Sequence, residues 1–131
     1  ARVIAGRVGD AKSPIETTVP TTMVHVKLEP GARLSIPVAA GSNAIVHTID
    51  GAGSVLGTAL RDHQVALIGD APAAVELAAQ AEPFEALVVA GEPLDEPVAR
   101  YGPFVMNTRG EIEQAFRDYQ AGRFGEIART N

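Results

Sequence analysis

The stretch TMVHVKLEPGARLSIPV, residues 22–38, decides the fold class of this chain. Both of its halves place apolar residues at every second position: Val24, Val26 and Leu28, then Leu34, Ile36 and Val38. This is the period of a β-strand with one buried face. Pro30 and Gly31 separate the halves and mark a turn. The stretch therefore predicts two consecutive strands joined by a turn.

Further short segments of strand character fill most of the chain on either side of this stretch. They are residues 2–5, 15–19, 43–51, 64–68, 73–83 and 84–91. Segment 73–83 is rich in alanine, which also suits a helix, but it is short, lies between proline-marked turns and keeps period two. Short strands with glycine and proline turns, and no interleaved helices, predict an all-β sandwich or barrel.

A single helix is predicted near the end of the chain, at about residues 109–121. Thr108 is followed three residues later by Glu111, the spacing of a capping box. An apolar stripe follows at the positions of one helix face: Ile112, Ala115, Phe116 and Tyr119. Gly122 stands where helices end in a residue with positive φ.

Composition excludes several classes of function. The 131 residues suit one domain, and a net charge of −5 without a basic cluster argues against direct nucleic-acid binding. No apolar run approaches the ~18 residues of a transmembrane helix, so we expect no membrane partner. The absence of cysteine excludes disulfides and thiolate metal sites and fits a cytoplasmic protein.

One set of glycines has a spacing similar to that of a dinucleotide-binding motif. Gly51, Gly53 and Gly57 follow a strand, and Asp70 comes about 20 residues later, as in a dinucleotide fingerprint. That interpretation needs a helix over residues 54–62 with Gly57 inside it. We favour a turn between antiparallel strands.

The segment GEPLDEPVARYGPFVMNTRGEIEQAFRDYQAGRFG, residues 91–125, resembles the C-terminal signature of the pirin family of bicupins. The resemblance extends through VIAG (3–6) and SPI (13–15) to the strand near Met23. It implies an all-β, cupin-type, jelly-roll-like sandwich or barrel with one C-terminal helix. Pirins have two cupin domains, and residues 1–131 resemble the second alone. We therefore expect a single cupin domain and a fragment of a longer protein.

The cupin resemblance also locates the positions of a metal site. A metal-binding cupin carries Gly-x5-His-x-His-x3-Glu, and from Gly31 the three ligand positions fall on Pro37, Ala39 and Asn43. Proline and alanine side chains cannot coordinate a metal, and neutral asparagine replaces a carboxylate poorly. We expect no metal, no cofactor and no catalytic residue in this chain. The resemblance places iron in the first, missing domain.

Asn43 and His47 are candidates for a vestigial pocket. The alternation groups His47 with Ile45 and Ile49, and the cupin motif implies that Asn43 on the same face points inward. Two interpretations of His47 follow. It is either a core histidine hydrogen-bonded to the backbone, or part of a polar patch in the vestigial cupin pocket. A small-ligand-binding module around these two residues is the alternative function.

Bulky residues outside the alternating strands are candidates for an interface: Tyr101, Phe104, Val105 and Phe124. They could contact the N-terminal cupin domain. Alternatively, they could hold the C-terminal helix and the segment that leads to it against this domain's own sheet. The resemblance implies a parent that is an iron-dependent, quercetinase-like dioxygenase or a transcriptional or metabolic co-regulator with a protein partner. We expect the chain alone to support the iron-binding domain rather than to act as an enzyme.

Overall fold

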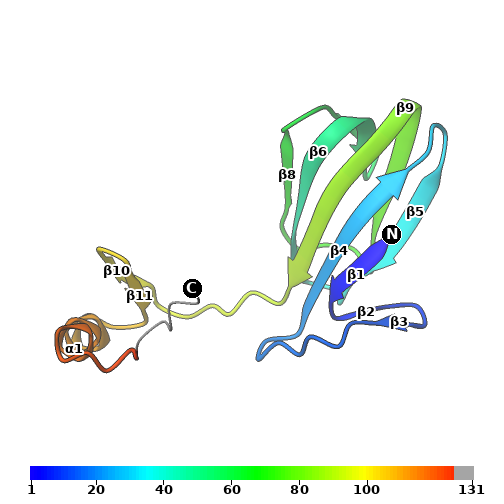
Figure 1. Cartoon of the computed structure of the whole chain (residues 1–131). Helices are drawn as coiled ribbons and strands as arrows, with labels where there is room; N and C mark the ends of the chain where they lie inside the picture. The colour runs from blue at the N-terminus through cyan, green and yellow to red at the C-terminus, as the bar shows by residue number, and fades with distance from the viewer. Residues whose placement is uncertain (126–131) are drawn as a thin grey trace, which may run out of the picture. The chain divides into compact units, whose positions relative to one another are not determined.

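Eleven strands and one helix make up residues 1–125, the part of the chain that the structure, a computed structural model, describes (Figure 1). The chain divides into two compact units at Pro93 and Leu94. The first contains β1 (Arg2–Ala5), β2 (Arg7–Val8), β3 (Ala11–Lys12), β4 (Thr21–Leu28), β5 (Arg33–Pro37), β6 (Asn43–Val55), β7 (Thr58–Leu60), β8 (Val65–Ile68) and β9 (Ala74–Gly91). The second contains β10 (Ala99–Tyr101), β11 (Phe104–Met106) and α1 (Arg109–Gln120).

The first unit is a sandwich because its two longest strands belong to both layers. The second half of β9 pairs with β4, and its first half pairs with β5. The first half of β6 pairs with β8, and its end pairs with β7. The first layer therefore has the order β1-β4-β9-β6-β8, and the second layer has the order β5-β9-β6-β7. All of these pairings are antiparallel, which confirms the all-β prediction.

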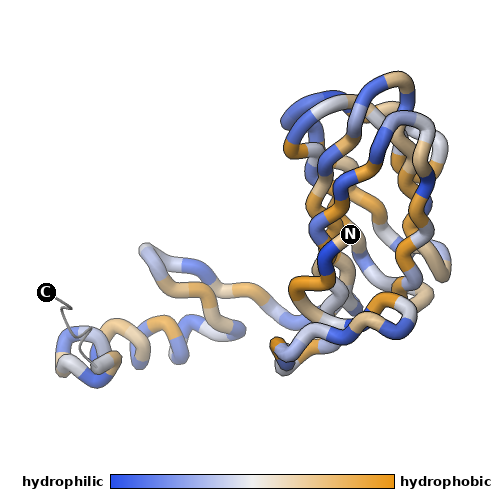
Figure 2. The backbone as a smooth tube through the Cα atoms, turned by 45° about the vertical axis from the view of Figure 1, so that its right-hand side comes forward, coloured by the Kyte–Doolittle hydropathy of each residue, from blue (hydrophilic) through white to orange (hydrophobic). Residues whose placement is uncertain are grey.

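Alternating side chains from both layers fill the interior. Figure 2 shows hydrophobic and hydrophilic residues alternating along these strands. The fully buried large side chains are Val24, Val26, Ile36, Val46, Val75, Leu77, Phe84 and Val88. The alternation predicted for residues 22–38 is confirmed, since Val24, Val26 and Ile36 are buried and Leu28, Leu34 and Val38 pack against the core.

Two glycines allow β6 to bend from one layer to the other. The register between β6 and β9 shifts at Thr48–Asp50 and again at Gly51–Gly53. Gly51 has φ +78°, and a Cβ there would overlap the carbonyl of Pro83; a Cβ on Gly53 would lie 2.6 Å from the ring of Phe84. The predicted turn between antiparallel strands is present at Leu56 and Gly57, between β6 and β7, whereas Gly51 and Gly53 lie within the bent strand. Residues 54–62 contain strand, turn and β7 instead of a nucleotide-binding helix.

Several sequence predictions of secondary structure need correction. Segment 15–19 is not a strand, and the loop before it holds the small β2–β3 hairpin instead. Segments 73–83 and 84–91 form one continuous strand, β9. The connection between residue 91 and α1 contains the β10–β11 hairpin, for which the sequence analysis gave no strands. Strands of two or three residues are too short to show a periodicity in sequence.

The predicted helix is confirmed as α1, with both arms of its capping box. The Thr108 hydroxyl accepts a hydrogen bond from the Glu111 amide at 3.3 Å, and the Glu111 carboxylate accepts one from the Thr108 amide at 2.8 Å. Gly122 has φ +70° and follows the C-cap residue. Ile112 and Ala115 are buried, but Tyr119 at the end of the predicted stripe is exposed. No helix within residues 1–125 is long and apolar enough to cross a membrane.

Thr108→Ala should destabilise α1 by about 1 kcal/mol because it removes the capping hydroxyl. Amide hydrogen exchange should quicken over residues 111–120 and stay unchanged in the strands of the first unit. A uniform acceleration across those strands would contradict a locally acting cap.

Candidate functional site

The three cupin ligand positions do not meet inside the sandwich. Pro37, Ala39 and Asn43 are all exposed, whereas the neighbouring Ile36 and Ala44 point into the core. The expectation that Asn43 points inward is therefore wrong. In β6 both sets of alternate residues mix apolar and polar side chains, so the sequence alone could not identify the buried set.

The inward-facing side chains do not suit a metal ion. The buried polar residues of the first unit are Ser13, Ser42 and Thr48, which offer hydroxyl groups rather than the imidazole and carboxylate ligands that iron prefers. Within the described residues no three His, Cys, Asp or Glu side chains gather as a possible metal site. The donor set of this domain therefore does not fit the iron expected of a cupin.

Asn43 and His47 lie on the outer face of the first layer. His47 is half-buried there, opposite Leu87 of β9 and Val65 of β8. A separate cleft of about 460 Å³ is lined in part by Ala39 and Ser42, but neither Asn43 nor His47 lines it. The predicted pocket residues are thus neighbours on a surface rather than walls of an interior pocket.

Thr48→Val should stabilise the domain by about 1 kcal/mol, because the side chain is fully buried and its hydroxyl has no hydrogen-bond partner within residues 1–125. Valine keeps the shape and removes the unpaired polar group. Urea denaturation of both proteins measures the change. A loss of stability would indicate that the Thr48 hydroxyl has a hydrogen-bond partner in solution and that water enters the interior of the sandwich.

The outer face of the first layer carries an unusual apolar patch. Its members are exposed side chains of β6 and β8: Ile45, Ile49, Val65 and Leu67, the last with 77% of its surface accessible. We call them the β6–β8 patch. Ile45 lies directly opposite Leu67, and half-buried Val89 of β9 flanks Ile45 on the other side. Antiparallel sheets usually present polar residues to water on their open face, so these side chains depart from the usual pattern.

A polar cluster crosses β4 and β9 on the same face. Glu85 Oε1 lies 2.7 Å from His25 Nε2, and Glu85 Oε2 lies 2.9 Å from Lys27 Nζ. Hydrogen bonds from Lys27 and then His25 hold the pKa of Glu85 below its ordinary value, which favours the carboxylate form. The sequence alone could not reveal this cluster, because Glu85 lies 60 residues from His25 in the chain.

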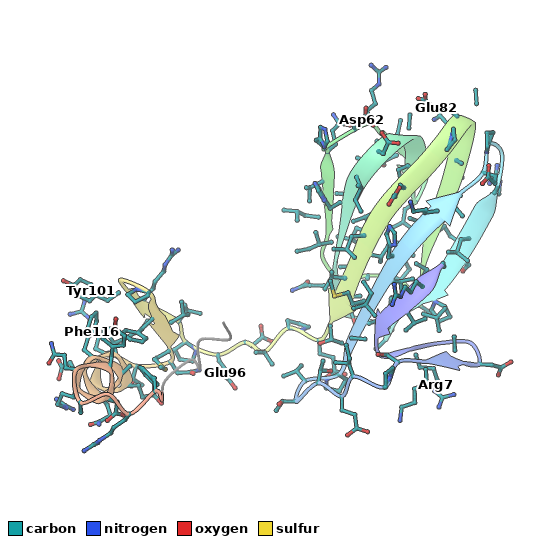
Figure 3. All side chains as sticks on the ribbon, in the orientation of Figure 1. Arg7, Asp62, Glu82, Glu96, Tyr101 and Phe116 are labelled. Atoms are coloured by element: carbon teal, nitrogen blue, oxygen red, sulfur yellow. The ribbon has the colours of Figure 1, made fainter. Side chains whose placement is uncertain are left out.

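The second unit is organised around Phe104. Its ring centroid lies 4.9 Å from that of Phe116, 6.3 Å from Tyr119 and 5.9 Å from Phe124. Tyr101 packs on Phe116 at 5.5 Å (Figure 3). Of the four predicted interface residues, Tyr101, Val105 and Phe124 are exposed and Phe104 is half-buried at the centre of the cluster.

Comparison with known proteins identifies related chains. The profile of the Pirin C-terminal cupin domain matches residues 23–125. A Pseudomonas aeruginosa protein provisionally named a quercetin 2,3-dioxygenase is 41% identical over 94% of this chain and 43% of its own length. Human pirin is 35% identical over 98% of this chain and 46% of its own. The crystal structure of a quercetin 2,3-dioxygenase from Acinetobacter baumannii superposes with a TM-score of 0.85 at 37% identity, over 97% of this chain and 44% of that one. The chain thus spans less than half the length of these relatives.

Proposed function

This chain belongs to the pirin family as its C-terminal cupin domain, and we propose that it is a metal-free supporting domain for an iron-bearing N-terminal cupin. In this proposal the two domains belong to one cytoplasmic protein. The C-terminal domain holds its partner through apolar surfaces and contributes no ligand to the iron.

The β6–β8 patch is the observation that carries this proposal. Soluble monomers rarely expose contiguous apolar surface, and here four branched side chains face outward from two neighbouring strands. Two sheets that pack face to face interdigitate such side chains at a spacing of ~10 Å. A second β-sandwich is therefore a suitable cover for this face.

The second unit supplies a further argument. Three of its bulky side chains, Tyr101, Val105 and Phe124, are exposed although its aromatic rings pack on one another. We propose that the exposed rings of Tyr101 and Phe124, together with Val105 and the Phe104 cluster, dock on the N-terminal cupin.

The activity of the parent protein is proposed from its relatives. Two relatives are named quercetin 2,3-dioxygenases and another is named pirin. We propose that the parent is an iron-dependent enzyme of the quercetinase kind or a co-regulator with a protein partner, with any chemistry in the N-terminal domain. A ligand pocket around Asn43 and His47 has less support, because Asn43 is exposed and His47 lies on the outer face.

Titration calorimetry with the separately produced N-terminal cupin tests the patch. Leu67→Asp places a charge within the proposed contact and should weaken binding at least 100-fold, because a buried unpaired charge is costly. Ala59→Asp is the matched control, since it changes an exposed position of β7, which also pairs with β6. Equal affinities for the two variants would contradict the assignment of this face. Iron should remain with the N-terminal domain throughout, as elemental analysis of the separated domains can show.

A further inference from the structure

A second feature of the first layer lies on its β1 side, away from β8 in the strand order. It is a cleft of about 500 Å³ with apolar walls formed by Val3, Ile4, Pro14, Ile15, Met23 and Leu87. Small-molecule sites commonly have volumes of about 300–1,000 Å³ and mostly apolar walls with a few polar groups. The cleft falls within this range, and three polar residues complete its lining: Arg2, Ser13 and His25.

A buried serine fixes one wall of the cleft. Ser13 is 3% exposed, and its hydroxyl donates to the Ile4 carbonyl at 2.6 Å and accepts from the Ile15 amide at 3.0 Å. Its own amide donates to the Gly6 carbonyl at 3.0 Å. These bonds tie the loop that carries Pro14 and Ile15 to β1. The wall is therefore held in place rather than formed by a loosely attached loop.

The imidazole of His25 is also held in place. Its Nε2 contacts Glu85 Oε1 at 2.7 Å, and Lys27 holds the other carboxylate oxygen of Glu85 at 2.9 Å. Among residues 1–125 the second ring nitrogen, Nδ1, has no hydrogen-bond partner. A carboxylate that orients a histidine in this way leaves the second nitrogen available to a ligand.

Arg2 gives the cleft a positive charge. No carboxylate in the described part of the chain lies within 4.0 Å of its guanidinium. The planar guanidinium forms paired hydrogen bonds with carboxylates and stacks on aromatic faces. The thioether of Met23 also makes favourable contacts with aromatic rings. Charge and wall chemistry thus favour a ligand that combines a ring with a carboxylate.

We propose that this cleft binds a small aromatic carboxylate, with the carboxylate on Arg2 and the ring between Met23, His25 and Leu87. The site uses other residues than the docking patch. The cleft lies on the β1 side of the first layer, whereas the patch lies on β6 and β8, with β9 between them.

Two-dimensional NMR titration of the whole chain with benzoate tests the proposal. Saturable shifts should be centred on Val3, Met23 and Leu87. Neutral benzamide and aliphatic butyrate should each bind at least about tenfold more weakly, because each lacks one of the two recognised features. Arg2 is exposed, so Arg2→Gln should leave the fold intact and lower benzoate affinity about tenfold. Arg33→Gln, an exposed arginine on β5 of the second layer, is the control and should change nothing.

Three results would each overturn the proposal: no saturable shifts with benzoate, equal binding of benzamide or butyrate, or equal loss of affinity in both arginine variants. Shifts centred on another surface would also overturn it. None of these results bears on docking of the N-terminal cupin, which is measured with a different ligand and with variants of a different surface.

Discussion

Gly51→Ala is expected to lower the free energy of unfolding of the first unit by about 3 kcal/mol. A left-handed backbone costs a residue with a Cβ about 1–2 kcal/mol, and forcing an atom into a packed site adds about 1–3 kcal/mol. Gly51 meets both conditions, with φ +78° and the Pro83 carbonyl in the place of a Cβ. Urea denaturation followed by circular dichroism measures the loss.

Gly57→Ala is the matched control for this bend. Gly57 has nearly the same backbone angle, φ +80°, but no atom lies within 4 Å of its added Cβ. It should lose only the backbone cost of about 1 kcal/mol. Equal losses at the two positions would show that β6 and β9 do not approach each other closely at the bend.

Phe104→Ala is expected to unfold the second unit. Replacing a packed phenylalanine by alanine costs about 3–5 kcal/mol, and the ring of Phe104 packs against three other rings of the second unit. The helical signal near 222 nm and the hydrogen-exchange protection of α1 should both be lost.

Val105→Ala is the matched control for Phe104→Ala, because it also shortens a side chain of β11. Val105 neighbours Phe104 on β11, but its side chain is exposed, so truncation should change stability by less than about 0.5 kcal/mol. If α1 keeps the same helical signal and exchange protection in both variants, the aromatic cluster does not hold the second unit together.

The features that the sequence predicted correctly are those encoded by neighbouring residues. The capping box of α1 depends on Thr108 and Glu111, three residues apart, and its geometry is as expected. The buried faces of β4 and β5 were clear because polar residues occupy the opposite positions of β4. The signature at residues 91–125 identified the family, which the profile match confirms.

The features that were missed depend on contacts between distant segments. Strand β6 carries apolar and polar residues on both faces, so period two alone could not show that Val46 and Thr48 are buried while Ile45 is exposed. A shift of one residue moves every side chain of a strand to the other face. Counting from Gly31 gave Pro37, Ala39 and Asn43 as the cupin positions, and all three side chains are exposed. The β6–β8 patch, the cluster around Glu85 and the cleft beside β1 all required the strand register.

Multi-angle light scattering of this chain mixed with the N-terminal cupin tests the central claim most directly. We predict a one-to-one complex with the summed mass of the two domains, together with self-association of the chain when it is alone, because its apolar surfaces are then uncovered. A chain that is monomeric alone and keeps its own mass when the N-terminal domain is added would contradict its role as a supporting domain.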